Sequence, residues 1–151
     1  MAANNAYLSA LANKAVSHVG DTFEDQLFVD FTGATYKGSA DSSYNLASAD
    51  YFTAFNIPAG GVITECGWVT HTTDANNPTF ALAGSDATST GEAMIGATAI
   101  GAKYAAVIAH DTSPVIFASS AGKVIVTGGT ATNDAGIVTF FIKGFVAKRQ
   151  S

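Results

Sequence analysis

The chain has 151 residues, of which 48% are hydrophobic and 13% are charged, and its formal net charge at pH 7 is −5. This length suits one domain with a sizeable core, and the high hydrophobicity excludes a disordered chain. The seven basic residues cluster nowhere but at the C-terminus, which argues against binding to nucleic acid. A surface so poor in charge is expected to be covered in part by a partner.

Residues 1–20 are predicted to form an arm or a short helix ahead of a single domain that spans residues 21–151. Leu8 and Leu11 lie at helical spacing, and Gly20 would end such a helix. The apolar stripe is rich in alanine and shallow, so the segment could equally be an extended arm lying on a neighbouring molecule. Leu8 and Leu11 are therefore candidate interface residues.

Residues 23–31 alternate in character, which predicts a strand with a wetter face formed by Glu24, Gln26, Phe28 and Asp30. The opposite face is apolar, with Asp25 as the exception. Residues 33–43 are small and polar and indicate a loop. Residues 44–55 are expected to contain one short strand.

Residues 51–84 predict a β-hairpin approached by a short lead-in strand. The turn at residues 57–61 contains a proline, whose ring presets φ, and two glycines that accept positive φ. Residues 62–73 are rich in valine, isoleucine and threonine, which suit a half-buried strand. After a break at residues 74–78, a period-two pattern resumes and ends at Gly84.

Residues 85–101 are dominated by Gly, Ala, Ser and Thr, which favours a long surface loop. Four more strands are then expected, at residues 103–110, 114–118, 123–127 and 136–147. About eight short strands separated by turns rich in Gly and Asn predict an all-β fold. The expected architecture is a single-domain antiparallel β-sandwich or jelly roll.

The last strand is apolar on one face and partly apolar on the other. Its core face is expected to contain Val138, Phe140, Ile142 and Val146. The opposite face carries Ile137, Phe141 and Phe145. Either a partner covers this second face, or the strand is buried on both sides within the domain. On the first interpretation, Ile137, Phe141 and Phe145 are interface candidates.

No motif for catalysis or metal binding is present. His18, His71 and His110 lack spacings such as H-x-H or H-E-x-x-H, and no glycine segment matches a nucleophile elbow or a phosphate loop. The single cysteine, Cys66, excludes an internal disulfide framework, and both Cys66 and Trp68 are expected in the core. The chain is predicted not to be an enzyme and to need no cofactor or metal.

Neither a secretory signal nor a run of about 18 apolar residues is found, so no membrane partner is expected. A small hydrolase has no support beyond scattered acids and histidines. Carboxylate pairs of the kind used in glycoside hydrolysis are not excluded by sequence, although the glutamates occupy ordinary polar positions.

The segment FNIPAGGVITECGWVTHTT, with a later strand ending in Ala83-Gly84 and a C-terminal run GIVTFFIKGF, resembles small virion proteins of tailed bacteriophages. In those proteins a proline-glycine turn leads into a strand carrying Gly-Trp, here Gly67-Trp68. A glycine-led apolar strand closes the chain. The resemblance covers about residues 51–147, and its motifs are patterns of residue type. Thr64-Glu65-Cys66 departs from the more apolar residues or glycines typical there.

The resemblance implies a capsid decoration (cement) protein, which binds the outside of a phage capsid and reinforces it. The implied partners are the major capsid protein and further copies of this chain, with a trimer favoured because capsids offer local three-fold positions. The implied location is the virion surface, after synthesis in the host cytoplasm. The alternative is a glycan- or receptor-binding module on a tail or spike, with Tyr36, Tyr44 or Tyr51 exposed in loops.

Overall fold

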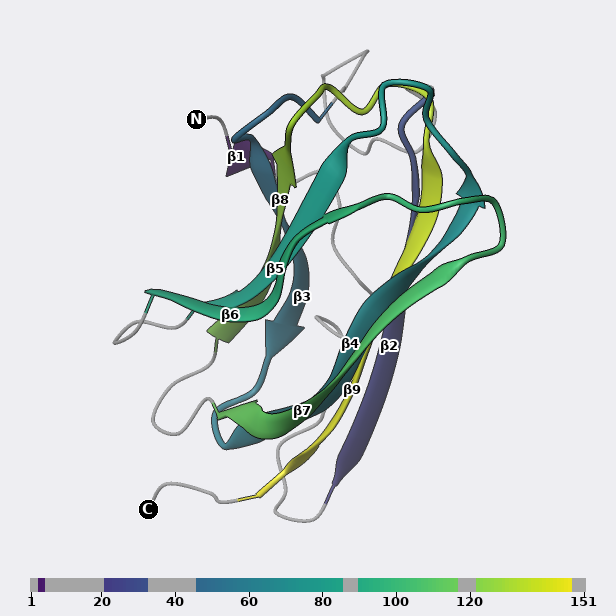
Figure 1. The fold of residues 1–151 in the computed structure, drawn as a ribbon. Coiled ribbons are helices and arrows are strands. Elements are labelled where there is room, and N and C mark those ends of the chain that lie inside the picture. Colours follow the sequence, from purple (N-terminus) through teal and green to yellow (C-terminus); the bar gives the residue numbers. More distant parts are fainter. Residues whose placement is uncertain (1–2, 5–20, 33–45, 86–89, 117–121, 148–151) are drawn as a thin grey trace.

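A computed structural model of the chain shows two β-sheets packed face to face (Figure 1). The structure describes residues 3–4, 21–32, 46–85, 90–116 and 122–147. All regular structure within these ranges is β-strand, which confirms the predicted all-β sandwich. Leu8, Leu11 and the rest of the predicted arm or helix, with the exception of residues 3–4, lie outside the described residues.

One sheet, called sheet A here, has the strand order β1-β3-β8-β5-β6. In this order its strands are β1 (Ala3–Asn4), β3 (Tyr51–Ile57), β8 (Gly122–Gly129), β5 (Thr79–Ser85) and β6 (Thr90–Ala99). The two-residue β1 pairs in parallel with β3, and the other pairings are antiparallel.

The facing sheet, called sheet B here, has the order β2-β9-β4-β7 and is antiparallel throughout. Its strands are β2 (Thr22–Asp30), β9 (Ile137–Val146), β4 (Gly61–Thr72) and β7 (Ala106–Ile116). The last strand of the chain thus lies between β2 and β4. Its pairing with β2 runs without irregularity from Thr22↔Phe145 to Asp30↔Ile137.

Successive strands alternate between the sheets. From β2 to β9, β5 and β6 are the one consecutive pair that shares a sheet. The β-sandwich part of the prediction is confirmed. The jelly-roll form stays a prediction, which this alternation supports.

The core between the sheets is built around aromatic rings. Phe140 lies 5.2 Å from Phe80 and 6.2 Å from Trp68, measured between ring centroids. The indole Nε1 of Trp68 donates a hydrogen bond to the Ile100 carbonyl oxygen at 3.0 Å, so its one polar group is satisfied. Cys66 is buried as well, and the sequence-based placement of Cys66 and Trp68 in the core is confirmed.

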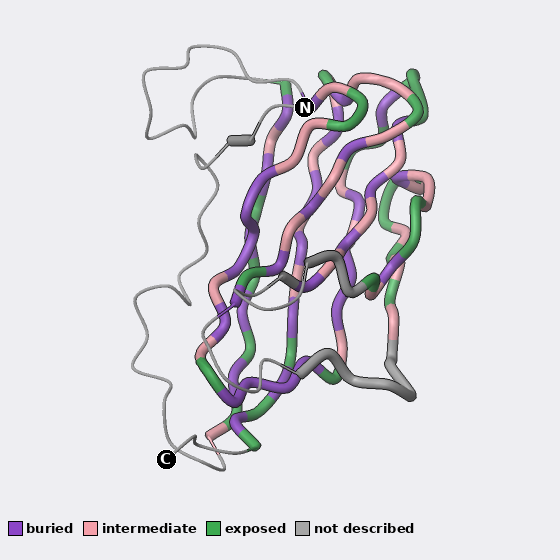
Figure 2. Tube along the Cα trace, turned by 90° about the vertical axis from the view of Figure 1, so that its left-hand side faces the viewer, coloured by how far each residue is buried: buried purple, intermediate pink, exposed green. Residues whose placement is uncertain are grey.

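The predicted strand phases are confirmed where alternation was the signal. Val138, Phe140, Ile142 and Val146 are all fully buried, and so are the core residues Phe80, Leu82, Val124 and Val126 on β5 and β8. Buried and more exposed positions alternate along the strands in Figure 2. On β2 even Asp25 follows the inward parity and is buried, and its Oδ1 accepts a hydrogen bond from the Gln26 amide at 2.9 Å.

The predicted hairpin is wrong. The turn itself exists, with Gly60 at a φ of 80° and the Gly61 amide donating to the Pro58 carbonyl oxygen at 2.9 Å. However, it passes the chain from β3 in sheet A to β4 in sheet B, and the loop after β4 returns it to sheet A. The residues of a tight turn determine only that the chain reverses direction. Which strands then pair depends on which apolar strand faces are buried together in the core.

The predicted loop at residues 85–101 is also wrong, because β6 occupies most of it. Small residues leave backbone groups free to pair, and β6 follows β5 with three shifts of register. Residues 103–110 and 114–118 were expected to form two strands, but one strand, β7, covers most of both. Ile63 and Glu65 are two positions apart on β4, but their partners on β7, Val115 and His110, are five positions apart. The intervening residues bulge without ending the strand.

Candidate functional site

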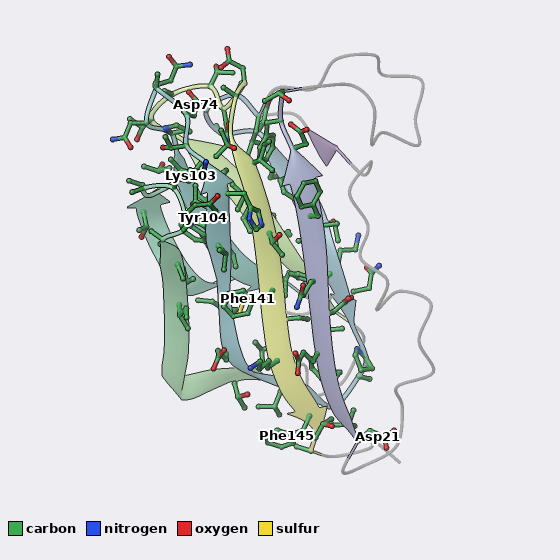
Figure 3. All side chains as sticks on the ribbon, turned by 90° about the vertical axis from the view of Figure 1, so that its right-hand side faces the viewer. Asp21, Asp74, Lys103, Tyr104, Phe141 and Phe145 are labelled. Atoms are coloured by element: carbon green, nitrogen blue, oxygen red, sulfur yellow. The ribbon has the colours of Figure 1, made fainter. Side chains whose placement is uncertain are left out.

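The outer face of sheet B carries the large apolar side chains that the described residues expose. These are Phe28 (57% exposed), Tyr104 (74%), Ile108 (47%) and Phe145 (37%). Phe28, Ile108 and Phe145 belong to strands of sheet B, and Tyr104 lies in the loop that leads into β7. Figure 3 shows this face, with Tyr104 near one end and Phe145 at the other. Within the described part of the chain, the exposed large apolar side chains therefore lie on one side.

Strand register places these residues in rows across the face. One row runs Gln26, Phe141, Gly67 and Ile108, from β2 through β9 and β4 to β7. The next row runs Phe28, Thr139, Val69 and Ala106. Phe141 and Val69 are half-buried, so the middle of the face is apolar and open to contact.

A charged row borders this apolar middle. Glu24 on β2, Lys143 on β9 and Glu65 on β4 are consecutive partners in the register. The Nζ atom of Lys143 lies 3.7 Å from Oε1 of Glu65. An apolar centre with a charged border is the usual anatomy of a protein–protein contact.

His71 lies within the apolar part of this face. Its Nε2 is 2.8 Å from the Thr139 hydroxyl oxygen, and its ring centroid is 5.9 Å from that of Phe28. His71 is not part of a metal-binding cluster: the described residues contain no group of three or more His, Cys, Asp or Glu side chains able to hold a metal ion. His18 and the side chain of His110 lie outside the described part of the chain.

Tyr104 is held at a backbone conformation that bulky residues rarely adopt, with a φ of 65°. Its amide donates to the Thr70 carbonyl oxygen at 2.7 Å, and the Thr70 amide donates to that of Ala105 at 2.9 Å. The Nζ atom of Lys103 lies 5.0 Å from the centroid of the Tyr104 ring. The loop is therefore fixed to β4 and presents an aromatic ring with a cation above it.

The structure brings Ile137, Phe141 and Phe145 together on the outer face of β9, as the sequence pattern indicated. Sequence reasoning missed Phe28, Ile108 and Tyr104. Phe28 had been placed on the wetter face of its strand, and one large apolar residue among polar ones was the signal available for it. Ile108 had a similar signal, a large apolar residue on the outward side of its strand. Nothing in the sequence pattern marks Tyr104.

At one end of the sandwich, the Asp74 carboxylate ties two loops together. One oxygen accepts the Asn76 amide at 2.8 Å, and the other accepts the amides of Asp134 and Ala135 at 2.9 and 3.0 Å. Burial by itself raises the pKa of Asp74, but these hydrogen bonds together outweigh it and leave the pKa below its ordinary value. This cluster joins the β4–β5 loop to the β8–β9 loop.

A small opening at the edge of the sandwich has space for about one water molecule. It is lined by Ile63, Thr64, Glu65, Cys66, Met94 and Ala109. A substrate would not fit into it. The described residues also include no helix long and apolar enough to cross a membrane.

The geometry above defines an antiparallel β-sandwich with one apolar outer face, and two solved structures share its fold. No family model and no curated protein matches the chain. A chain in the capsid of Ralstonia phage GP4 has a TM-score of 0.60 at 17% identity, over 97% of both chains. A chain in the capsid asymmetric unit of cyanophage Pam1 has a TM-score of 0.57 at 19% identity, over 88% of this chain and 91% of that one.

Proposed function

We propose that the chain is a structural protein of a phage virion, which binds the outside of the capsid as a decoration (cement) protein and reinforces it. The observation that carries this proposal is the agreement in fold with a chain of the Ralstonia phage GP4 capsid over 97% of both chains. The second similar structure also comes from a phage capsid.

The surface of the chain supports a role based on packing. With 13% charged residues and an apolar face on sheet B, the protein gains by covering that face. Burying one large apolar side chain is worth about 1.5–3 kcal/mol, from which the costs of association are subtracted. Several such side chains together can hold a protein on a shell without any chemical step.

The proposed partners are the major capsid protein and further copies of this chain, with a trimer favoured at local three-fold positions. The candidate contact residues are Leu8 and Leu11 in the N-terminal segment and Ile137, Phe141 and Phe145 on β9. A ring of three copies needs two different complementary surfaces on each copy. The N-terminal segment and the body of the domain could supply such a pair.

One observation favours the second candidate, a glycan- or receptor-binding module. Tyr104 is 74% exposed and carries the Lys103 ammonium over its ring, an arrangement that suits stacking on a ligand. Of the three tyrosines that the sequence suggests for such a module, Tyr51 is half-buried on β3, whereas Tyr36 and Tyr44 lie outside the described residues.

Imaging of particles made with and without this chain tests the proposal. The expected result is density on the outer surface of the head that is lost without the chain, together with release of the genome at a lower temperature. Density on the tail or spike, combined with a specific signal on a glycan array, would favour the second candidate.

A further inference from the structure

We infer that the outer face of sheet B is the surface that docks on the capsid shell, and that the shell presents basic side chains around an apolar patch at this site. The inference rests on the proposed function and specifies its partner surface. It is carried by the distribution of apolar and charged groups over one face of the sandwich.

The apolar part of the face is continuous across the four strands. Phe28, Phe141, Val69 and Ile108 come from β2, β9, β4 and β7, in adjacent rows of the register. Gly67 lies between Phe141 and Ile108 and is buried, because the Val107 backbone of β7 occupies the place that a side chain would take. The strands are therefore closed at this point, and the apolar side chains on either side of Gly67 are the groups that a partner would contact.

The charged groups around this centre are mainly acidic. The outward positions of the sheet B strands carry Glu24, Asp30, Glu65 and Lys143, and Asp21 and Lys103 lie at its two ends (Figure 3). Both lysines interact within the chain, Lys143 with Glu65 at 3.7 Å and Lys103 with the Tyr104 ring at 5.0 Å. The complementary surface is therefore one that supplies positive charge.

This distribution disfavours a second copy as the occupant. Two copies packed face to face would bring acidic borders together, and each carries a formal net charge of −5. Like charges in contact across an interface oppose association. Copies of this chain would then meet through other surfaces, and sheet B would remain available for the shell.

Tyr104 extends the face at one end and serves as an anchor. A bulky residue at positive φ carries a backbone strain that the fold maintains, and such strain gathers at binding sites. Tyrosine is also among the residues that contribute most to binding energy when an interface covers them. The backbone of this loop is already held by hydrogen bonds to Thr70, so little backbone freedom is lost on docking.

The test measures binding of purified protein to phage particles that lack this chain, by co-sedimentation at increasing salt. Gln26→Lys adds a positive charge beside Phe141, whereas Ala93→Lys makes the same change on the outer face of sheet A. Both positions are exposed, so both variants are expected to fold, which thermal unfolding verifies. Tyr104→Ala examines the anchor.

At low salt we expect Gln26→Lys to bind about three to ten times more weakly than Ala93→Lys, with the difference shrinking near 1 M salt. Tyr104→Ala should weaken binding about tenfold at all salt concentrations. Equal binding of the two lysine variants would overturn the inference, and so would stronger self-association of Gln26→Lys in light scattering. Failure of the wild-type chain to bind any particle would instead refute the proposed function.

Discussion

Phe140 lies in the aromatic core between the two sheets. It is fully buried on β9 and contacts three rings, those of Phe52, Trp68 and Phe80. Removing such a ring leaves a cavity that the two sheets cannot close, because each sheet is held by its own hydrogen bonds.

Phe140→Ala should therefore lower the free energy of unfolding by about 3–5 kcal/mol, measured by denaturant unfolding. Phe28→Ala is the matched control, because Phe28 is 57% exposed and its removal should cost about 1 kcal/mol or less. Similar losses for the two variants would show that the core has been placed wrongly.

Asp74 gives the stability of the protein a dependence on pH. Its pKa is lower in the folded chain than the ordinary carboxyl value of 3.8. The stabilisation is therefore fully present above that ordinary value and is lost as the pH falls through the folded pKa.

Asp74→Asn keeps one acceptor oxygen but replaces the other with an NH2 group. That group would face backbone N–H donors, which the carboxylate oxygen accepted before. The substitution should lower the free energy of unfolding by about 1–3 kcal/mol at pH 7. The gap between variant and wild type should narrow below about pH 4, as the wild-type carboxylate takes up a proton. A gap that is constant from pH 7 to pH 2.5 would show that the charge of Asp74 contributes nothing.

At the level of single residues, the sequence predicted a side chain's position where a repeating pattern indicated it. The inward phases of β2, β8 and β9 were predictable because a period of two recurs over many positions. Tyr104 was not predictable, since its positive φ depends on backbone hydrogen bonds to Thr70, which is distant in sequence. The carboxylate network of Asp74 likewise joins loops 60 residues apart.

At the level of the strands, β9 packs closely against its neighbours at Gly144. A Cβ atom at Gly144 would lie 2.1 Å from the Val62 carbonyl oxygen and 2.6 Å from the Phe23 ring. The ring of Phe23 fills the space that a side chain would otherwise take.

Gly144→Ala should destabilise the protein by about 1–3 kcal/mol, because backbone of β4 must shift to accept the methyl group. Gly96→Ala on β6 is the matched control: a Cβ there meets nothing within 4 Å, and its φ is not positive. That variant should be neutral or up to about 1 kcal/mol more stable, through a less flexible unfolded chain. Equal melting temperatures for the two variants would contradict the close approach at Gly144.

Pairing between elements was the level at which sequence reasoning failed. Composition marked the turn at residues 57–61 but could not show that its flanking strands enter different sheets. The small residues of β6 gave no strand signal, because their contribution is backbone pairing with β5. The polar residues 111–113 predicted a break between two strands, whereas they form part of a bulge within the single strand β7. The apolar outer face of β9 was predictable, whereas its extension to Phe28 and Ile108 required the register of sheet B.

At the scale of the whole molecule, the charge-poor surface predicts self-association. We expect light scattering at micromolar concentration to give a homo-oligomer, most readily a trimer. Gln26→Lys should leave that mass unchanged, because the proposed docking face is separate from the contacts between copies. A stable monomer would contradict the oligomer and would leave sheet B as the sole surface for assembly.

The position of β9 has a consequence for how the protein is made. Sheet B cannot be completed until its final strand is available, because β9 lies between β2 and β4. Until β9 is available, β2 and β4 lack the strand that lies between them. Side chains on their inward faces, such as Val29 and Trp68, then stay uncovered. Non-local pairing of this kind makes folding slow and favours aggregation of incomplete chains. A chain that stops before Ile137 would leave β2 without a partner strand in sheet B, beside the remaining β4–β7 pair.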